Sequence, residues 1–184
     1  MDGQPLQDLV AALESALTQS GKNLVQLSES APVLLVFLRH AGCTFCREAI
    51  GDIAEARLAI EAAGVRIVLV HMGDLEAIGR LLEKNGLAGV DRICDREQNL
   101  YRAFGLKRGK LLQLFGPKVL WRGLQAGLLG RHGIGRVSAD SAQMPGLFLL
   151  DKAAIVRRYR HRSAGDRPDY DAICEILAES RSGL

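Results

Sequence analysis

The cysteines at positions 43 and 46 are the residues of this chain best suited to chemistry. They lie in Gly42-Cys43-Thr44-Phe45-Cys46-Arg47-Glu48, between an apolar run at 33–38 and a long segment with helical character. Where a strand gives way to a helix, unpaired backbone N–H groups and the helix dipole favour negative charge, so the pKa of a cysteine falls from about 8.5 toward roughly 3.5–7.5. The thiolate is the nucleophile, and a second thiol one turn away closes a small disulfide ring. The spacing therefore predicts that one cysteine attacks and the other resolves the intermediate.

Zinc binding is the main alternative for such a pair. A structural zinc ion needs four ligands, and the chain has no second Cys-x-x-Cys and no His-x-x-x-His to complete the set. The two remaining cysteines, Cys94 and Cys174, stand alone and are interpreted as small core residues. We therefore expect a redox site and no metal.

The segments around the pair alternate between predicted strands and helices. Short β-branched apolar runs predict strands, and longer segments with apolar residues every three or four positions predict helices. The expected elements are a helix over 5–19, an edge strand over 23–27, strands at 33–38, 65–70 and 90–94, and helices over 44–63 and 74–84. This alternation predicts crossover connections and a largely parallel sheet. In that setting a Cys-x-x-Cys is typical of thioredoxin-type redox sites.

The pattern changes in the second half of the chain. Residues 105–143 hold eight of the 20 glycines, seven Lys or Arg and one acid, and are interpreted as a basic Gly-rich insertion with some helix near 118–129. Such a segment would attract anionic substrates or an acidic partner. After it, 146–151 and 154–160 are predicted to form a hairpin, and the segment from Pro168 to Leu177 a closing helix.

Length and composition fit one globular domain over 1–184, in which residues 1–22 form an N-terminal helical extension. The formal charge of +3 is too small to indicate nucleic-acid binding. The start of the chain does not resemble a signal peptide, and no apolar run approaches the length of a membrane span, so a cytoplasmic protein with reduced thiols is expected. No nucleotide-binding motif follows a strand, so we expect no flavin or nicotinamide cofactor and an external thiol as the electron source.

Four segments together resemble successive blocks of one family. They are Phe37-Leu38-Arg39-His40-Ala41-Gly42-Cys43-Thr44-Phe45-Cys46-Arg47-Glu48, residues 94–106, Gln143-Met144-Pro145-Gly146-Leu147-Phe148-Leu149-Leu150-Asp151, and residues 159–166. The chain resembles the peroxiredoxin-like alkyl hydroperoxide reductase/thiol-specific antioxidant (AhpC/TSA) family. The branch it resembles carries Cys-x-x-Cys and includes selenoprotein L and the prostamide/prostaglandin F synthases.

This resemblance implies a thioredoxin-like α/β fold with a mixed central sheet, flanking helices and a cis-proline at Pro145 opening the strand after the insertion. It also implies a peroxidase or thiol-disulfide oxidoreductase that acts on a peroxide or a disulfide and is reduced by a thioredoxin-like or other thiol donor. Cys43 and Cys46 would be catalytic. The residues expected to bind substrate are Arg39, Thr44, Phe45, Met144 and Pro145.

The chain departs from the peroxiredoxin pattern P-x-x-x-T-x-x-C. Aligned on Cys46, Arg39 stands at the proline and Cys43 at the threonine. The alignment makes Cys46 the attacking thiol. In thioredoxin the more exposed, N-terminal cysteine of the pair attacks, which here is Cys43. The order in which the two cysteines react stays open. A peroxidase needs a cation near the attacked oxygens, for which Arg39, Arg157 and Arg162 are candidates. A different class of function is a non-catalytic binding module that keeps the fold as a scaffold.

Overall fold

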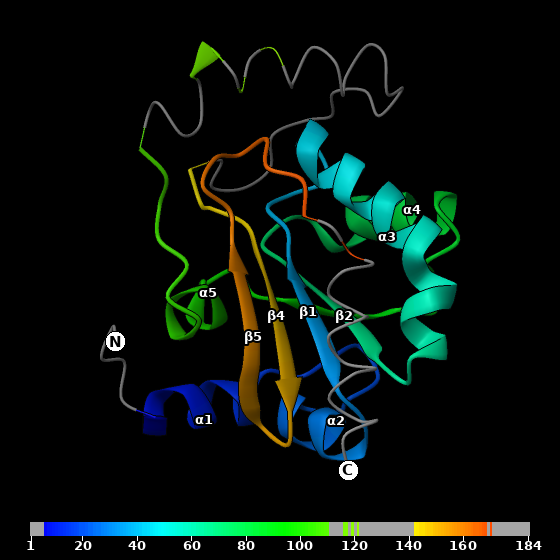
Figure 1. Cartoon of the computed structure of the whole chain (residues 1–184), viewed down its shortest axis with the longest axis vertical. Helices are drawn as coiled ribbons and strands as arrows, with labels where there is room; N and C mark the ends of the chain where they lie inside the picture. The colour runs from blue at the N-terminus through cyan, green and yellow to red at the C-terminus, as the bar shows by residue number, and fades with distance from the viewer. Residues whose placement is uncertain are drawn as a thin grey trace.

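The computed structural model describes residues 6–110, 116, 117, 119, 121, 142–168 and 170. Its centre is a five-stranded sheet in the order β3-β2-β1-β4-β5 (Figure 1). The strands are β1 (Val33–Phe37), β2 (Arg66–His71), β3 (Asp91–Cys94), β4 (Gly146–Asp151) and β5 (Ala154–Arg160). The helices are α1 (Leu6–Ser15), α2 (Leu24–Ser30), α3 (Thr44–Ala62), α4 (Leu75–Lys84) and α5 (Asn99–Ala103).

The sheet is mixed, as expected. β1 pairs in parallel with β2, which pairs in parallel with β3, while β4 runs antiparallel to both β1 and β5. The predicted hairpin of β4 and β5 is confirmed, and its two turn residues, Lys152 and Ala153, both have positive φ, as tight hairpin turns require. The carboxyl end of β1 and the amino end of β4 therefore lie side by side at the same end of the sheet, where Phe37 pairs with Gly146.

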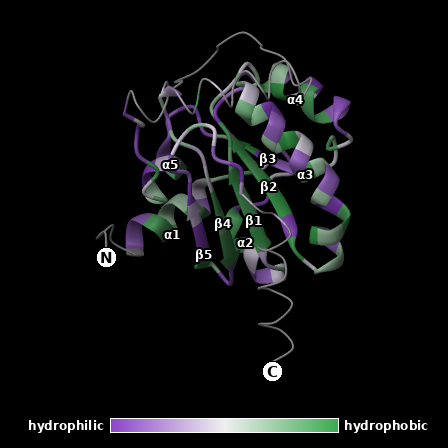
Figure 2. Ribbon diagram, turned by 45° about the horizontal axis from the view of Figure 1, so that its top comes forward, coloured by the Kyte–Doolittle hydropathy of each residue, from purple (hydrophilic) through white to green (hydrophobic). Residues whose placement is uncertain are grey.

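Two hydrophobic layers cover the sheet, one on each face. All five residues of β1 are buried, because successive side chains enter opposite layers: Leu34 and Val36 pack with α3 and α4, while Val33, Leu35 and Phe37 pack with α1, α2 and α5. Figure 2 shows the central strands as largely hydrophobic. No helix within the described ranges has the length and apolar character needed to cross a membrane.

The edge strand expected at 23–27 is wrong, because these residues begin helix α2. Asn23 is its N-cap: the Asn23 side chain accepts from the Gln26 amide at 2.9 Å, and the Gln26 side chain accepts from the Asn23 amide at 3.1 Å. This reciprocal capping box satisfies two amides that a helix leaves unpaired. It outweighs the modest strand propensity of the segment.

The two ends of the predicted insertion lie side by side. Arg108 and Gln143 form an antiparallel bridge, the Gly109 amide donates to Ala142 at 2.7 Å, and the Met144 amide donates to Lys107 at 3.2 Å. Most of the helix expected near 118–129 and of the closing helix from Pro168 lies outside the described residues.

The prediction of a cis-proline at Pro145 is wrong, because the Met144–Pro145 peptide bond is trans. The pairing just described keeps this segment extended as it enters β4. The Gln143 amide group adds bonds to the carbonyls of Leu106, at 3.0 Å, and Met144, at 3.3 Å. Trans is also the intrinsically favoured state of an X–Pro bond, by about 0.5–1 kcal/mol.

Candidate active site

The two cysteines lie where β1 gives way to α3. Cys43 is the N-cap of α3, and its carbonyl accepts from the Arg47 amide at 3.0 Å, which starts the helix. Cys46 follows in the first turn, and both thiols are free and buried. The predicted meeting of strand, helix terminus and cysteine pair is thus present in the fold.

Arg39 contacts both sulfur atoms. Its guanidinium Nη2 donates to Cys43 Sγ at 2.8 Å, and its backbone amide donates to Cys46 Sγ at 3.2 Å. Arg39 lies two residues after the end of β1 and is buried, with 7% of its surface exposed. A buried guanidinium needs a negative partner, because an isolated charge is costly away from water. A thiolate on Cys43 supplies that partner.

The two thiols differ strongly in acidity. The pKa of Cys43 is lowered to about 6, chiefly by the hydrogen bond from Cys46; burial opposes the change, and the positive charge of Arg39 reinforces it. Burial raises the pKa of Cys46 well above its ordinary value, and the hydrogen bond with Cys43 raises it further. These opposite shifts favour ionisation of Cys43 before Cys46.

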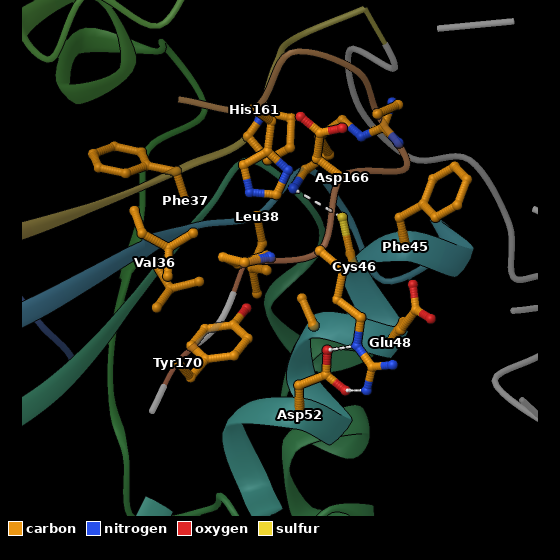
Figure 3. A pocket seen from close by; sticks show the side chains of 17 residues that line it. Val36, Phe37, Leu38, Phe45, Cys46, Glu48, Asp52, His161, Asp166 and Tyr170 are labelled. Atoms are coloured by element: carbon orange, nitrogen blue, oxygen red, sulfur yellow. Dashed lines mark hydrogen bonds and ion pairs between the residues drawn. The ribbon is translucent and has the colours of Figure 1, made fainter. Parts of the chain in front are cut away.

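A small pocket opens beside Cys46. Its cavity of about 20 Å³ accommodates roughly one water molecule. Arg39 and Pro145 are among the residues that line it. Phe45, His161 and Tyr170 also line it, as Figure 3 shows. A larger substrate can enter only if residues that line the pocket move. Otherwise it must reach Cys43 without entering the pocket.

The loop after β5 forms one wall of the pocket. Asp166 shapes the loop by accepting from the Ser163 amide at 3.2 Å and from its hydroxyl at 2.8 Å. The next residue, Arg167, makes a two-pronged bond to Asp52 of α3, which Figure 3 shows below Cys46. The loop is thus anchored to the helix that carries both cysteines.

The structure brings some of the predicted substrate-binding residues together and separates others. Arg39, Phe45 and Pro145 line the pocket with Cys46. Thr44 is half-buried in the first turn of α3, and Met144 packs against Val119 and Ala164 without lining the pocket.

The three candidate cations are also distinguished. Arg39 is bonded to Cys43, whereas Arg157 lies exposed on β5 opposite Leu149 and Arg162 lies exposed on the following loop. Cys94 is half-buried, and its thiol points to the Gly73 carbonyl at 3.8 Å. Cys174 lies outside the described residues.

Two residues near the site were not identified from the sequence. The Tyr101 hydroxyl donates to the Leu38 carbonyl, directly before Arg39, and His161 lines the pocket. Both belong to segments that resemble family blocks, but nothing local to them points to Cys46. Among the described residues, no group of three His, Cys, Asp or Glu side chains is arranged to hold a metal ion.

Comparison with known sequences places the chain in a family. The sequence model described as AhpC/TSA antioxidant enzyme matches residues 52–165, more than half of the chain. The chain belongs to the AhpC/TSA family. The matched residues begin just after Cys46, so the part played by the two cysteines is argued from their geometry.

Relatives within this family match most of the chain. Peroxiredoxin-like 2C of Mus musculus is 26% identical over 191 residues, covering 95% of this chain and 80% of the relative. The prostamide/prostaglandin F synthase of Sus scrofa is 27% identical over 175 residues, covering 91% of this chain and 84% of the relative. These similarities support a redox function at the level of the family.

Solved structures confirm the thioredoxin-like fold. Peroxiredoxin Q of Xanthomonas campestris superposes with a TM-score of 0.61 at 15% identity, with 95% of this chain and 93% of that chain covered. The thioredoxin domain of a thiol-disulfide oxidoreductase from Bacteroides vulgatus gives a TM-score of 0.52 at 15% identity, with 88% of this chain and 91% of that domain covered. At these identities the likeness concerns the fold alone.

Proposed function

We propose that this protein is a two-cysteine oxidoreductase in which Cys43 attacks the substrate and Cys46 resolves the intermediate. The observation that carries the proposal is that the Arg39 guanidinium donates to Cys43 Sγ at 2.8 Å, whereas the Arg39 backbone amide donates to Cys46 Sγ at 3.2 Å. The guanidinium contact favours the thiolate on Cys43, and the thiolate is the reactive form. In this order the N-terminal cysteine of the pair attacks, as in thioredoxin. The peroxiredoxin alignment would instead make Cys46 the attacking thiol.

A hydroperoxide is the substrate class we favour. The Cys43 thiolate attacks the terminal oxygen, the O–O bond breaks, and an alcohol or water leaves after taking up a proton, with a sulfenic acid on Cys43. The Cys46 sulfur then attacks Cys43, and water leaves as the disulfide forms. Arg39 stands beside the attacking sulfur, where its donors can stabilise negative charge on the departing oxygen.

A protein disulfide is the second candidate, favoured by the activation of the N-terminal cysteine of the pair. The Cys43 thiolate attacks one sulfur and releases a thiolate, and Cys46 then displaces the second thiol as the internal disulfide forms. In both cases two electrons leave the dithiol. A thioredoxin-like or other thiol donor then reduces the disulfide, and the names of the relatives, peroxiredoxins among them, agree with this class of chemistry.

Stopped-flow mixing of the reduced protein with cumene hydroperoxide, and separately turnover of insulin disulfides, distinguishes the two substrates. Fast, saturating thiol loss with peroxide supports the peroxidase, and indifference to peroxide with insulin turnover supports the reductase. Cys43→Ser should abolish either activity, while Cys46→Ser should allow one turnover and trap the adduct. If both serine variants lacked these activities but kept full function in cells, the binding-module alternative would be favoured.

The single-domain organisation over 1–184 and the cytoplasmic compartment belong to this proposal. A dithiol that must be reduced after each turnover fits a reducing compartment. Fractionation of cells that express a tagged full chain tests the compartment.

A further inference from the structure

One peptide group connects the two hydrophobic layers next to the cysteines. The Leu38 carbonyl accepts a hydrogen bond from the Tyr101 hydroxyl, and the amide of the same peptide group, that of Arg39, donates to Cys46 Sγ at 3.2 Å. Tyr101 belongs to the layer with α1, α2 and α5, whereas Cys46 belongs to the layer with α3 and α4. A continuous chain of hydrogen bonds therefore runs from the Tyr101 hydroxyl, through the Leu38–Arg39 peptide group just after β1, to Cys46 Sγ.

Tyr101 is firmly held as the donor of this chain. It is completely buried, packs edge-on against Phe37 with ring centroids 5.0 Å apart, and its hydroxyl also reaches the Val70 carbonyl at 3.2 Å. Its own backbone amide donates to the Asp95 carboxylate at 3.3 Å, which fixes the start of α5. Burial, followed by the proximity of Cys46, raises the pKa of Tyr101 well above its ordinary value, so the phenol keeps its proton.

Backbone hydrogen bonds on both sides hold the Leu38–Arg39 peptide group in place. The Leu38 amide donates to Val70 at 2.8 Å and the Met72 amide donates to the Arg39 carbonyl at 3.2 Å, so β2 holds this stretch on both sides of the shared peptide. The phenol polarises the peptide carbonyl, and hydrogen bonds in a chain strengthen one another. The hydrogen bond from the Arg39 amide to Cys46 Sγ becomes stronger as that sulfur gains negative charge.

We propose that Tyr101 is a positioning residue that acts through the Leu38–Arg39 peptide to assist Cys46 in resolving the intermediate. This inference rests on the proposed function. When Cys43 carries a mixed disulfide, the Cys46 sulfur attacks Cys43, the bond to the bound thiol breaks, and the proton of Cys46 ends on that departing thiolate. The Arg39 amide, reinforced by Tyr101, stabilises the thiolate that forms on Cys46 when it gives up its proton to begin the attack.

Dithiodipyridine tests this directly, because each attack releases one absorbing thiopyridone. Cys43 releases the first and Cys46 the second, so two phases report the two steps in the full chain with Cys94 and Cys174 replaced by serine. In Tyr101→Phe we expect a first phase within twofold of the parent and a second phase about fivefold slower, since a net hydrogen bond has been lost. Tyr159→Phe, which removes an exposed hydroxyl on β5, is the matched control and should change neither phase.

Fluorotyrosine placed at position 101 gives the opposite test. Its phenol is more acidic and donates more strongly, so the second phase should become faster, an outcome that a purely structural role does not produce. Unchanged phases in both variants, or equal slowing of both phases in Tyr101→Phe, would overturn the inference. If the parent shows no first phase, or Cys43→Ser keeps it, the proposed function itself fails instead.

Discussion

The Arg167 guanidinium makes two hydrogen bonds to the Asp52 carboxylate, at 2.8 and 2.6 Å, and so joins the loop after β5 to helix α3. Both residues also line the pocket beside Cys46. We therefore expect this pair, which joins two distant parts of the sequence, to limit access to the buried thiol.

Breaking this pair should expose Cys46 with little cost in stability. The Arg167 side chain is 55% exposed, so Arg167→Gln is expected to change the free energy of unfolding by less than about 1 kcal/mol. Alkylation of Cys46, measured in a Cys43→Ser background, should become several-fold faster. Arg57→Gln, which breaks a surface pair with Glu61, is the control and should leave the alkylation rate unchanged. Equal rates in both variants would show that the loop does not depend on this pair.

Removing the charge of Arg39 should raise the pKa of Cys43. In Arg39→Gln the thiolate loses both its hydrogen-bonded cation and the associated charge, so iodoacetamide labelling of Cys43 near pH 6.5 should slow by about tenfold. Arg39→Lys keeps the charge without the planar fork and should recover part of the rate. A pH profile of labelling checks this, and a midpoint near 6 in Arg39→Gln would contradict it.

The reactivity of the wild-type protein should follow the ionisation of Cys43. With its pKa at about 6, the rate of the first step is expected to be half-maximal near that pH and to level off above neutrality. His161 should add no second transition there, because burial, together with the charge of Arg39, lowers its pKa to about 4. Stopped-flow rates from pH 5 to 9 test this expectation. A midpoint near the ordinary cysteine value would remove the reason for assigning the attack to Cys43.

Acid should destabilise the protein through His71. This side chain is fully buried, and burial lowers its pKa to about 4, against the opposing effect of the Gly73 backbone. The unfolded chain binds a proton below about pH 6.5 and the folded chain does not, so stability falls between those two values and no further below pH 4. Urea unfolding at pH 7 and 4.5 should show a loss on the order of 2 kcal/mol from this residue. His71→Asn should lose less stability over the same interval than the parent.

The sequence was sufficient to predict the placement of the cysteine pair, because both flanking elements have strong patterns. The six-residue apolar run around β1 and the long helical segment of α3 fix the junction to within a residue or two. The hairpin of β4 and β5 was equally clear. In contrast, the signal for α2 was present but overlooked, since Asn23 followed by Gln26 three residues later is the pattern of a capping box.

The sequence could not show which arginine contacts the cysteines. Arg39, Arg157 and Arg162 are equivalent by residue type, and only the path of β1 brings Arg39 against Cys43. Tyr101 is 63 positions from Leu38, and a contact of that span depends on how α5 packs under the sheet. The pairing of Arg108 with Gln143, which holds the segment before Pro145, is likewise a long-range contact that the local sequence does not show.

That pairing has a further consequence for how this chain can vary. The chain leaves the sheet at the end of β3, at Cys94, and re-enters it at Gly146. Between these points the Gly109 amide donates to the Ala142 carbonyl at 2.7 Å. This hydrogen bond holds the two ends of the intervening segment together just before β4, and Val119 within the segment packs against Met144 and Ala164. We therefore expect changes in the length of this segment to cost only a little loop-closure entropy, as long as its paired ends and the Val119 contact are kept.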